Sequence, residues 1–358
     1  MQTMECKSNE PGSKNSKSRA KQEKAKYHRL MGLLILLSVA AAIGAICIGR
    51  YMIGVREVVR VLVNEIVPLT PDWNQKAPSV ILNLRLPRII GAYLVGGALA
   101  ISGAAYQGVF KNPLVSPDLL GISSGACVGA SLAILMGLNY FSIQVSAFVW
   151  GILTVFLTTL LPRILKNNSM TTLVLSGVIV SGIMNSIMGI IKYVADPETQ
   201  LAAITYWQLG SMTKVMRADV LAVAPMILIA TIVLLLLRWK INLLSLGETE
   251  ARTLGVDTEK LKIVIIVCAT MLTACSVCLC GTIGWVGLVI PHLSRMFAGP
   301  DNSRSLPVSF ALGGLFMLVI DTVARAATSV EIPLSVLTGL IGAPFYFYVL
   351  SKQRMKLS

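Results

Sequence analysis

The chain is strongly apolar for its length. It has 358 residues, of which 55% are hydrophobic and 13% charged, and its mean hydropathy is +0.74. A soluble domain typically has about 45–50% apolar and about 25% charged residues. These figures exclude a soluble enzyme, a disordered chain and a nucleic-acid-binding protein. The formal net charge of +14 does not restore the last class, because much of it lies between apolar runs, where basic residues orient a membrane protein.

The first 29 residues form a basic, polar tail with eight Lys or Arg and three Glu. Such a composition cannot bury a core, so we expect residues 1–29 to be disordered. A secretory signal is the competing interpretation, but the basic region is too long and no clear small-residue cleavage site follows Ile48. We therefore expect a cytoplasmic tail that either contacts anionic lipid head groups or is simply solvated.

Ten apolar segments follow the tail. They cover 30–49, 88–109, 118–137, 141–162, 171–194, 218–237, 262–281, 284–297, 306–328 and 333–350. A spanning helix needs about 20 apolar residues, so the short eighth segment is interpreted as a half-helix or a tilted span buried in protein. The sequence thus predicts an all-α polytopic membrane protein, with a single ten-span domain over residues 30–352.

The distribution of Lys and Arg predicts the orientation of the spans. With the tail inside and ten crossings, the C-terminal end 353–358 is also cytoplasmic, which agrees with the basic residues near it. The segment between the first and second spans would then lie outside, yet it carries six Lys or Arg, among them Arg85 and Arg88. Arginines held outside against this bias suggest a function.

No group of residues favours catalysis. Neither of the two His belongs to a metal-ligand set or an acid–base pair, and the chain has no P-loop motif. Cys275, Cys278 and Cys280 cluster in one apolar run without His or carboxylate nearby, so packing explains them better than a metal site. We expect no catalytic residue, no resident metal and no cofactor in this chain.

Two charged residues lie within the ninth apolar segment. Asp321 and Arg325 are four positions apart and share one face of a helix, where they can pair. An intramembrane charge is a candidate functional residue, but a structural ion pair explains these two equally well. Glu331, just before the tenth segment, is interpreted as a favourable charge at a helix N-terminus.

The loop 238–261 contains a short helical motif. Two glycines bracket one or two turns, in which one charged pair has i, i+4 spacing and two apolar residues form a small stripe. The motif consists of Gly247, Glu248, Glu250, Ala251, Arg252, Leu254 and Gly255, with the pair at 248 and 252 and the stripe at 251 and 254. Such a helix in a cytoplasmic loop either docks in the groove of a partner or serves as a surface connector.

Seven short motifs occur in order along the chain. They are Leu84-Arg-Leu-Pro-Arg88, Gly96-Gly-Ala-Leu-Ala-Ile-Ser-Gly103, Asn112-Pro-Leu-Val115, Leu119-Leu-Gly-Ile-Ser-Ser-Gly125, Gly284-Trp-Val-Gly-Leu-Val-Ile-Pro-His292, Asp321-Thr-Val-Ala-Arg325 and Glu331-Ile-Pro-Leu334. The series resembles the FecCD-type permeases for iron siderophores, heme and cobalamin. The resemblance covers about residues 30 to 352 and implies a type II ABC importer permease fold with ten spans per subunit.

The resemblance also implies an assembly in the plasma or inner membrane. The chain would pair with a second permease subunit, as a homodimer or alternatively as a heterodimer with a similar chain. Two cytoplasmic ATPases, which hold ATP and Mg, would bind the motif in loop 238–261. An extracytoplasmic binding protein would deliver the ligand, with its acidic residues received by Arg85, Arg88 and Arg325.

The family's cytoplasmic gate has two parts. Asn112 and Leu114 match one part, and Met170 and Thr171 fall at the other. A polar pair occupies the second part in the best-studied cobalamin permease, so Met170 weakens an assignment to cobalamin. The resemblance implies a non-enzymatic subunit that moves an iron chelate by alternating access, most often a ferric siderophore, with heme or cobalamin as alternatives.

Two other classes remain open on the residues alone. A secondary transporter driven by protons or sodium would need a titratable carboxylate in its path, and only Asp321 lies deep enough in an apolar segment. An intramembrane enzyme would need a nucleophile–base or metal constellation, which the sequence does not present.

Overall fold

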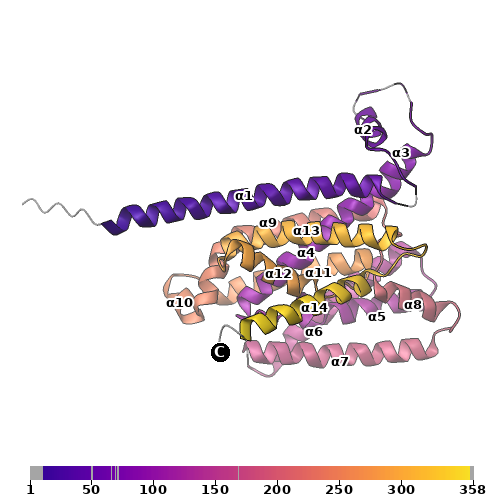
Figure 1. Cartoon of the computed structure of the whole chain (residues 1–358). Helices are drawn as coiled ribbons and strands as arrows, with labels where there is room; N and C mark the ends of the chain where they lie inside the picture. The colour runs from indigo at the N-terminus through magenta and orange to yellow at the C-terminus, as the bar shows by residue number, and fades with distance from the viewer. Residues whose placement is uncertain are drawn as a thin grey trace, which may run out of the picture.

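The computed structural model describes residues 11–49, 51–65, 67–68, 70, 72–167 and 169–354. This part of the chain is built from helices and contains no β-strand (Figure 1). The elements are α1 (Pro11–Cys47), α2 (Val55–Asn64), α3 (Ala77–Ser79), a π-helical turn (Val80–Arg85), α4 (Leu86–Val109), a 3-10 turn (Pro117–Leu120), α5 (Ile122–Leu135), α6 (Tyr140–Ile164), α7 (Met170–Val194), α8 (Gln200–Leu209), α9 (Arg217–Leu246), α10 (Glu248–Thr253), α11 (Thr258–Cys280), α12 (Val286–Ala298), α13 (Asn302–Ala326) and α14 (Leu334–Arg354).

Each of the ten apolar segments predicted from the sequence contains an apolar helix. Within the described residues, seven helices are long and apolar enough to cross a membrane, and α5, α12 and α14 are shorter apolar helices. The predicted segment 118–137 is interrupted, because a 3-10 turn precedes α5 and ends at Gly121 with a φ of +79°. The structure therefore confirms an all-α polytopic membrane protein, with α2 and α8 as additional short helices.

Helix α1 is longer than the sequence predicts. Residues 11–29, expected to be disordered, continue the first span as helix, whereas residues 1–10 and 355–358 lie outside the described residues. Lys, Arg, Ala, Gln and Glu are good helix formers, and a helix already nucleated in the span extends through them readily. The extension is also held in place: Glu23 pairs with Arg304 at 3.0 Å, and Tyr27 packs against α13.

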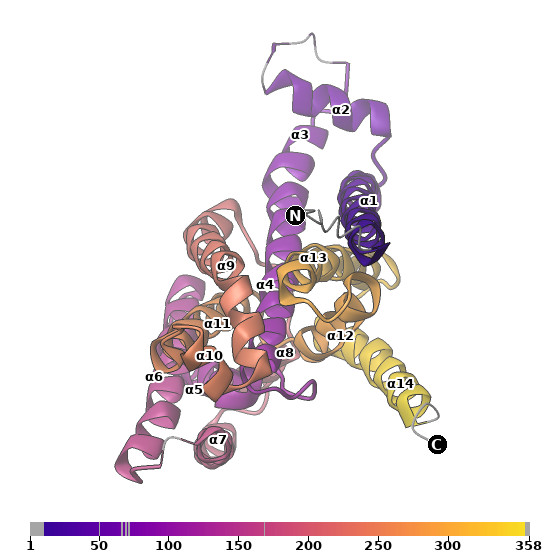
Figure 2. The same cartoon turned by 90° about the vertical axis from the view of Figure 1, so that its left-hand side faces the viewer.

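Helix α4 lies at the centre of the bundle. Figure 2, which looks along the bundle, shows it between α9 and α13, and every side chain from Leu94 to Val109 is buried. Glycines make this possible: a Cβ added to Gly103 would lie 1.8 Å from the carbonyl oxygen of Gly287, and one added to Gly96 would lie 2.2 Å from that of Gly313. Such close backbone approach is a main source of helix association in lipid.

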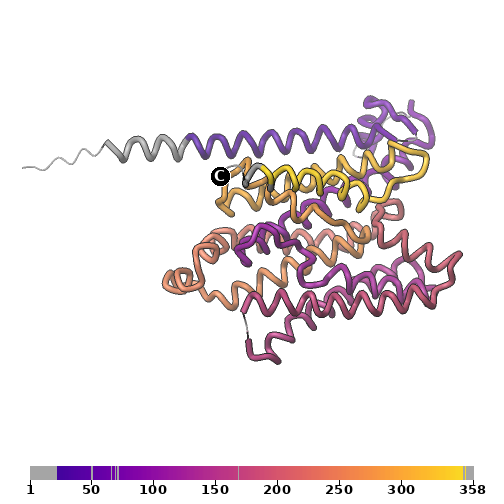
Figure 3. Tube along the Cα trace, turned by 60° about the horizontal axis from the view of Figure 1, so that its bottom comes forward, coloured from indigo at the N-terminus to yellow at the C-terminus, as the bar shows by residue number. Residues whose placement is uncertain are grey.

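The loops gather at the two ends of the bundle, because the long helices run alongside one another (Figure 3). One end carries α10, the loop after α4 and the start of α7; we call it the α10 end. The other carries α2, α8 and the segment between α13 and α14; we call it the α8 end. The residues singled out by the sequence fall into two groups, one at each end.

The central packing of α4 predicts the effect of a single methyl group. Gly103→Ala should lower the free energy of unfolding by about 3 kcal/mol, because the new Cβ meets the backbone of α12 and cannot be accommodated by a side-chain rotation. Thermal unfolding of the purified protein in detergent measures this effect.

Gly182→Ala is the matched control, since a Cβ there has no neighbour within 4 Å on the exposed face of α7. We expect this variant to unfold at the wild-type midpoint or slightly above it, because Ala favours a helix over Gly. Equal losses in the two variants would contradict the packing argument.

Candidate functional site

Arg88 joins three parts of the structure at the α8 end. From α4, its guanidinium donates to both carboxylate oxygens of Asp321 on α13, at 2.8 to 3.0 Å. It also donates to both carboxylate oxygens of Glu331, in the segment between α13 and α14, at 2.9 Å. The hydroxyl of Thr213, before α9, donates to Glu331 at 2.7 Å. Charge-assisted bonds of this kind are about twice as strong as neutral ones. One guanidinium therefore fastens two helices and one loop, and Glu331 ties a second loop to them through Thr213.

This network is shielded from solvent to different degrees. The side chain of Asp321 is 1% exposed and that of Arg88 is 11% exposed, whereas Glu331 keeps 25%. An isolated buried charge costs several kcal/mol, so Arg88 and Asp321 each depend on the other. Glu331 has the freest access to solvent of the three.

Arg85 and Arg325 cap the C-terminal end of helix α1. Their guanidinium groups donate to main-chain carbonyls in its last turn and just beyond it. The acceptors are the carbonyl oxygens of Ala45, Ile46, Cys47 and Tyr51. The last carbonyls of a helix lack intrahelical partners and carry partial negative charge, so two cations here form a C-terminal cap. Gly49 permits this approach, since a Cβ there would lie 2.7 Å from Nη2 of Arg85.

These contacts bear on two predictions. Arg85, Arg88 and Arg325 are expected to receive acidic residues of a binding protein, and in this structure all three are largely buried and hydrogen-bonded within the chain. The expected Asp321–Arg325 ion pair is present, with Nε of Arg325 3.9 Å from the carboxylate. Arg88 is the close partner of Asp321 and lies 233 positions away, beyond the reach of any i, i+4 rule.

A cavity of about 790 Å³ lies beside the network at the α8 end. Its walls are mostly apolar and aromatic, with Tyr206 and Trp207 from α8. The polar side chains in its lining include Ser211, Thr213, Lys214, Ser329 and Glu331. The Lys214 ammonium lies 5.9 Å from the ring centre of Tyr140, within cation–π range. Cavities of about 300–1,000 Å³ with apolar walls and few polar groups are typical of small-molecule sites.

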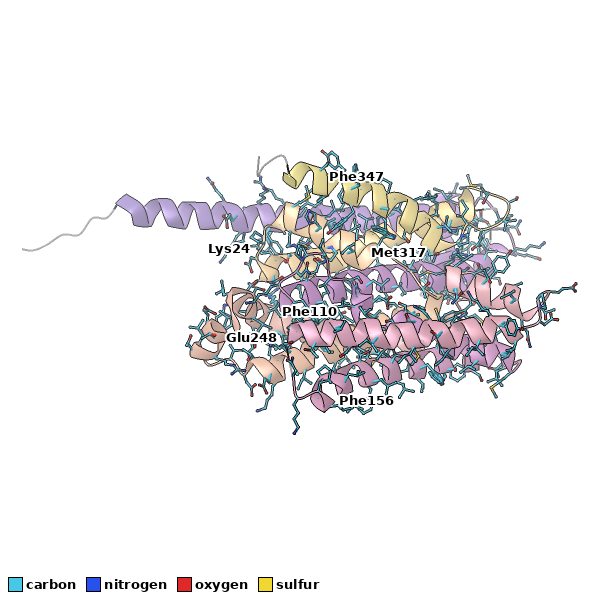
Figure 4. The ribbon with its side chains drawn as sticks, turned by 90° about the horizontal axis from the view of Figure 1, so that it is seen from below. Lys24, Phe110, Phe156, Glu248, Met317 and Phe347 are labelled. Atoms are coloured by element: carbon cyan, nitrogen blue, oxygen red, sulfur yellow. The ribbon has the colours of Figure 1, made fainter. Side chains whose placement is uncertain are left out.

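Helix α10 connects α9 to α11 at the other end, where Figure 4 shows Glu248. The predicted short helix is present at Glu248–Thr253. The predicted pairing is different, because Glu248 pairs with Lys262 and Arg252 pairs with Glu259 at 3.5 Å. Both partners belong to α11, so these contacts tie α10 to the next helix.

The predicted apolar stripe on α10 is wrong. Ala251 is buried beneath the helix, whereas Leu254 is 60% exposed. Leu246, just before α10, is 70% exposed. A partner at this end would therefore meet the two exposed leucines that flank α10, and Ala251 would support the helix from below.

The ends of α10 are set by short-range contacts. The Glu250 carboxylate lies against Gly247, where a Cβ would be only 1.6 Å from it. Gly255 has a φ of +79°, a left-handed conformation that favours Gly. Asp257 then caps α11: a hydrogen bond from the main-chain N–H of Lys260, at 3.1 Å, lowers the pKa of its carboxyl and keeps it charged.

The predicted gate residues lie at the α10 end, on two separate elements. Asn112 and Leu114 are in the loop after α4, where the Asn112 side chain accepts the Leu114 N–H at 2.9 Å. Met170 and Thr171 open α7, with Met170 packed partly against the core and Thr171 exposed. The side-chain amide of Gln107 donates to the main-chain carbonyl of Val115 at 3.1 Å. This bond holds the loop that carries Asn112 and Leu114 to the end of α4.

Sequence reasoning missed Glu331, Thr213 and Lys214 as site residues. The sequence suggests Glu331 as a charge at the start of a helix, but α14 begins only at Leu334 and the carboxylate binds Arg88. The count of charges in the sequence could have pointed to Glu331. Arg85, Arg88 and Arg325 share one region with a single deep acid, Asp321, so a second acid was to be expected there. Nothing in the sequence around positions 213 and 214 marks them as cavity residues.

The bundle, the charged network at one end and the exposed connecting helix at the other define a multi-pass membrane transport subunit. The model of the FecCD transport family matches residues 33–352. The chain belongs to this family, which consists of permease subunits of ABC transporters, and those subunits are not themselves enzymes.

The chain is similar to several known permeases. It is 39% identical to the molybdate import system permease protein MolB of Haemophilus influenzae, over 88% of this chain and 93% of the relative. It is 40% identical to a probable iron chelatin transport system permease protein of Helicobacter pylori, over 77% of this chain and 83% of the relative. A solved structure of a metal-chelate type ABC transporter, in an inward-facing conformation, shares 37% identity at a TM-score of 0.81, over 91% of this chain and 99% of that one.

The buried ion pair predicts a large stability effect. Asp321→Asn should lower the free energy of unfolding by about 3 kcal/mol, because Arg88 would keep a charge that Glu331 alone must balance. The midpoint of thermal unfolding in detergent reports this loss.

Asp72→Asn serves as the control, since Asp72 pairs with Arg60 at the surface and is 52% exposed. An exposed pair contributes about 0–1 kcal/mol, so this variant should unfold close to wild type. If both variants lost the same stability, the Arg88 network would not have the importance assigned to it.

Proposed function

We propose that this chain is the permease subunit of an importer for an iron chelate, with ferric siderophores as the leading class. The observation that supports this cargo is the cavity at the α8 end. Molybdate, named for one relative, is a small tetrahedral oxyanion that requires a tight ring of donors. A cavity of about 790 Å³ with aromatic walls is better suited to a larger, partly apolar chelate.

The charges of the cavity are consistent with an anionic chelate. The carboxylate of Glu331 is balanced by Arg88, whereas Lys214 is exposed and faces the ring of Tyr140. The cavity therefore offers a cation and aromatic surface to a ligand that carries both negative charge and aromatic groups. Heme and cobalamin are the alternatives, since both are large enough to need a similar cavity.

The mechanism that we propose is alternating access between two permease subunits, as a homodimer or with a similar second chain. The α8 end would face outward, toward a binding protein, and both termini would lie in the cytoplasm. Two ATPase subunits, which hold ATP and Mg, would bind at the α10 end. The exposed leucines beside α10 would provide the contact, and the ion pairs from α10 to α11 would pass its motion to the spans.

Reconstituted transport tests the cargo. Proteoliposomes that hold this chain with its cognate ATPase, supplied with the cognate binding protein, should take up one ferric siderophore only when ATP is present. The panel includes ferric siderophores, heme, cobalamin and molybdate, each with and without ATP. Uptake of molybdate alone would reject the iron-chelate assignment, and uptake driven by a proton or sodium gradient would reject the ATP-driven mechanism.

The coupling role of α10 predicts the effect of one surface charge. Leu254→Asp should reduce ATP-dependent uptake at least tenfold and weaken co-purification with the ATPase, because the charge would stay desolvated in the contact. Leu165→Asp is the control, since Leu165 is 61% exposed at the same end of the bundle but follows α6. Normal uptake by Leu254→Asp, or equal losses in both variants, would contradict the role of α10.

A further inference from the structure

The charged cluster at the α8 end has an unequal charge count. It consists of Arg85, Arg88, Arg325, Asp321 and Glu331, with three positive charges and two negative ones. Arg85 and Arg325 donate to main-chain carbonyls of α1 and its end, which carry only partial charge. The cluster is therefore able to receive a further carboxylate, and Arg88 is the member whose present partners are carboxylates.

The two acids on Arg88 are not equivalent. Asp321 is 1% exposed and belongs to the body of α13, so a helix of 25 residues would have to move before it could leave. Glu331 is 25% exposed and belongs to the non-helical segment between Ala326 and Leu334. Of the two acids, only Glu331 belongs to a segment that can move without disturbing a membrane-spanning helix.

Glu331 also holds part of the cavity wall. It accepts from Arg88 and from Thr213, and both Thr213 and Glu331 line the cavity. The rest of its segment is fixed elsewhere: the N–H of Ile332 donates to Ala324 at 3.1 Å, and the N–H of Leu334 donates to Gly210 at 3.0 Å. Loss of the Glu331 contacts would thus remove the hydrogen bonds that hold this segment to Arg88 and Thr213, and leave α14 in place.

We propose that Glu331 occupies the position on Arg88 that a carboxylate of the docking protein takes. Docking then exchanges one acid for another and releases the 327–331 segment from Thr213, which opens the cavity toward the incoming ligand. The exchange keeps two carboxylates on Arg88, because Asp321 stays in place and the incoming acid replaces Glu331. This inference rests on the proposed function, because it takes the α8 end to be the docking face.

The test is the affinity of the assembled transporter for its binding protein. Glu331→Gln removes the competing charge, so the cognate binding protein should bind about fivefold more tightly to the variant in nanodiscs. Asp196→Asn is the matched control, because it removes one negative charge from an exposed loop at the same end without touching Arg88. It should bind as wild type does.

Unchanged or weaker binding by Glu331→Gln, or an equal gain in the control, would overturn the exchange. If Glu331→Gln fails to fold, Thr213→Val removes one tether and keeps the charge; about twofold tighter binding supports the exchange, and wild-type binding rejects it. The proposed function is judged separately on the wild type. If the wild type neither binds the binding protein nor shows ATP-dependent uptake, the proposed function is rejected. If the wild type does both and Glu331→Gln leaves the affinity unchanged, only the exchange is rejected.

Discussion

The structure depends on one constraint, which is that the guanidinium of Arg88 must never be left unpaired inside the bundle. A buried charge is tolerated only where its partners are held in place. Asp321 comes from α13 and Glu331 from the following loop, so the charge of a single side chain fixes how α4, α13 and the wall of the cavity lie together. The same requirement explains why two carboxylates bind this one guanidinium.

Helix α4 carries this constraint along the bundle. Arg88 lies in its first turn and Gln107 in its last, so the helix joins the charged network to the loop that holds Asn112. Its 24 residues span about 36 Å at 1.5 Å per residue. Glycine contacts such as that at Gly103 leave it no room to bend, so a displacement at one end would be transmitted to the other as movement of a rigid body.

The sequence is informative where the physics is local and fails where partners are distant. Apolar runs predicted all ten apolar helices, and bracketing glycines predicted α10, because both depend on neighbouring residues. The prediction of disorder was wrong for residues 11–29, since composition does not reveal that Glu23 pairs with Arg304 on α13. Arg88 was identified as important, but its partners and the cavity depend on packing between helices far apart in the chain. The motifs of a family mark such residues without showing what they contact.

The charge on Glu331 has a second consequence for the ligand. While Glu331 is paired with Arg88, Lys214 offers a cation to an anionic ligand in the cavity. An acid released from Arg88 by exchange would no longer be paired, and its negative charge would offset the attraction of Lys214 as the ligand enters. A transport path must bind its cargo strongly enough to admit it and weakly enough to let it leave. The exchange at Arg88 would therefore do more than open the cavity: it would lower the affinity for an anionic chelate as the transfer begins, so that the ligand passes on instead of remaining bound.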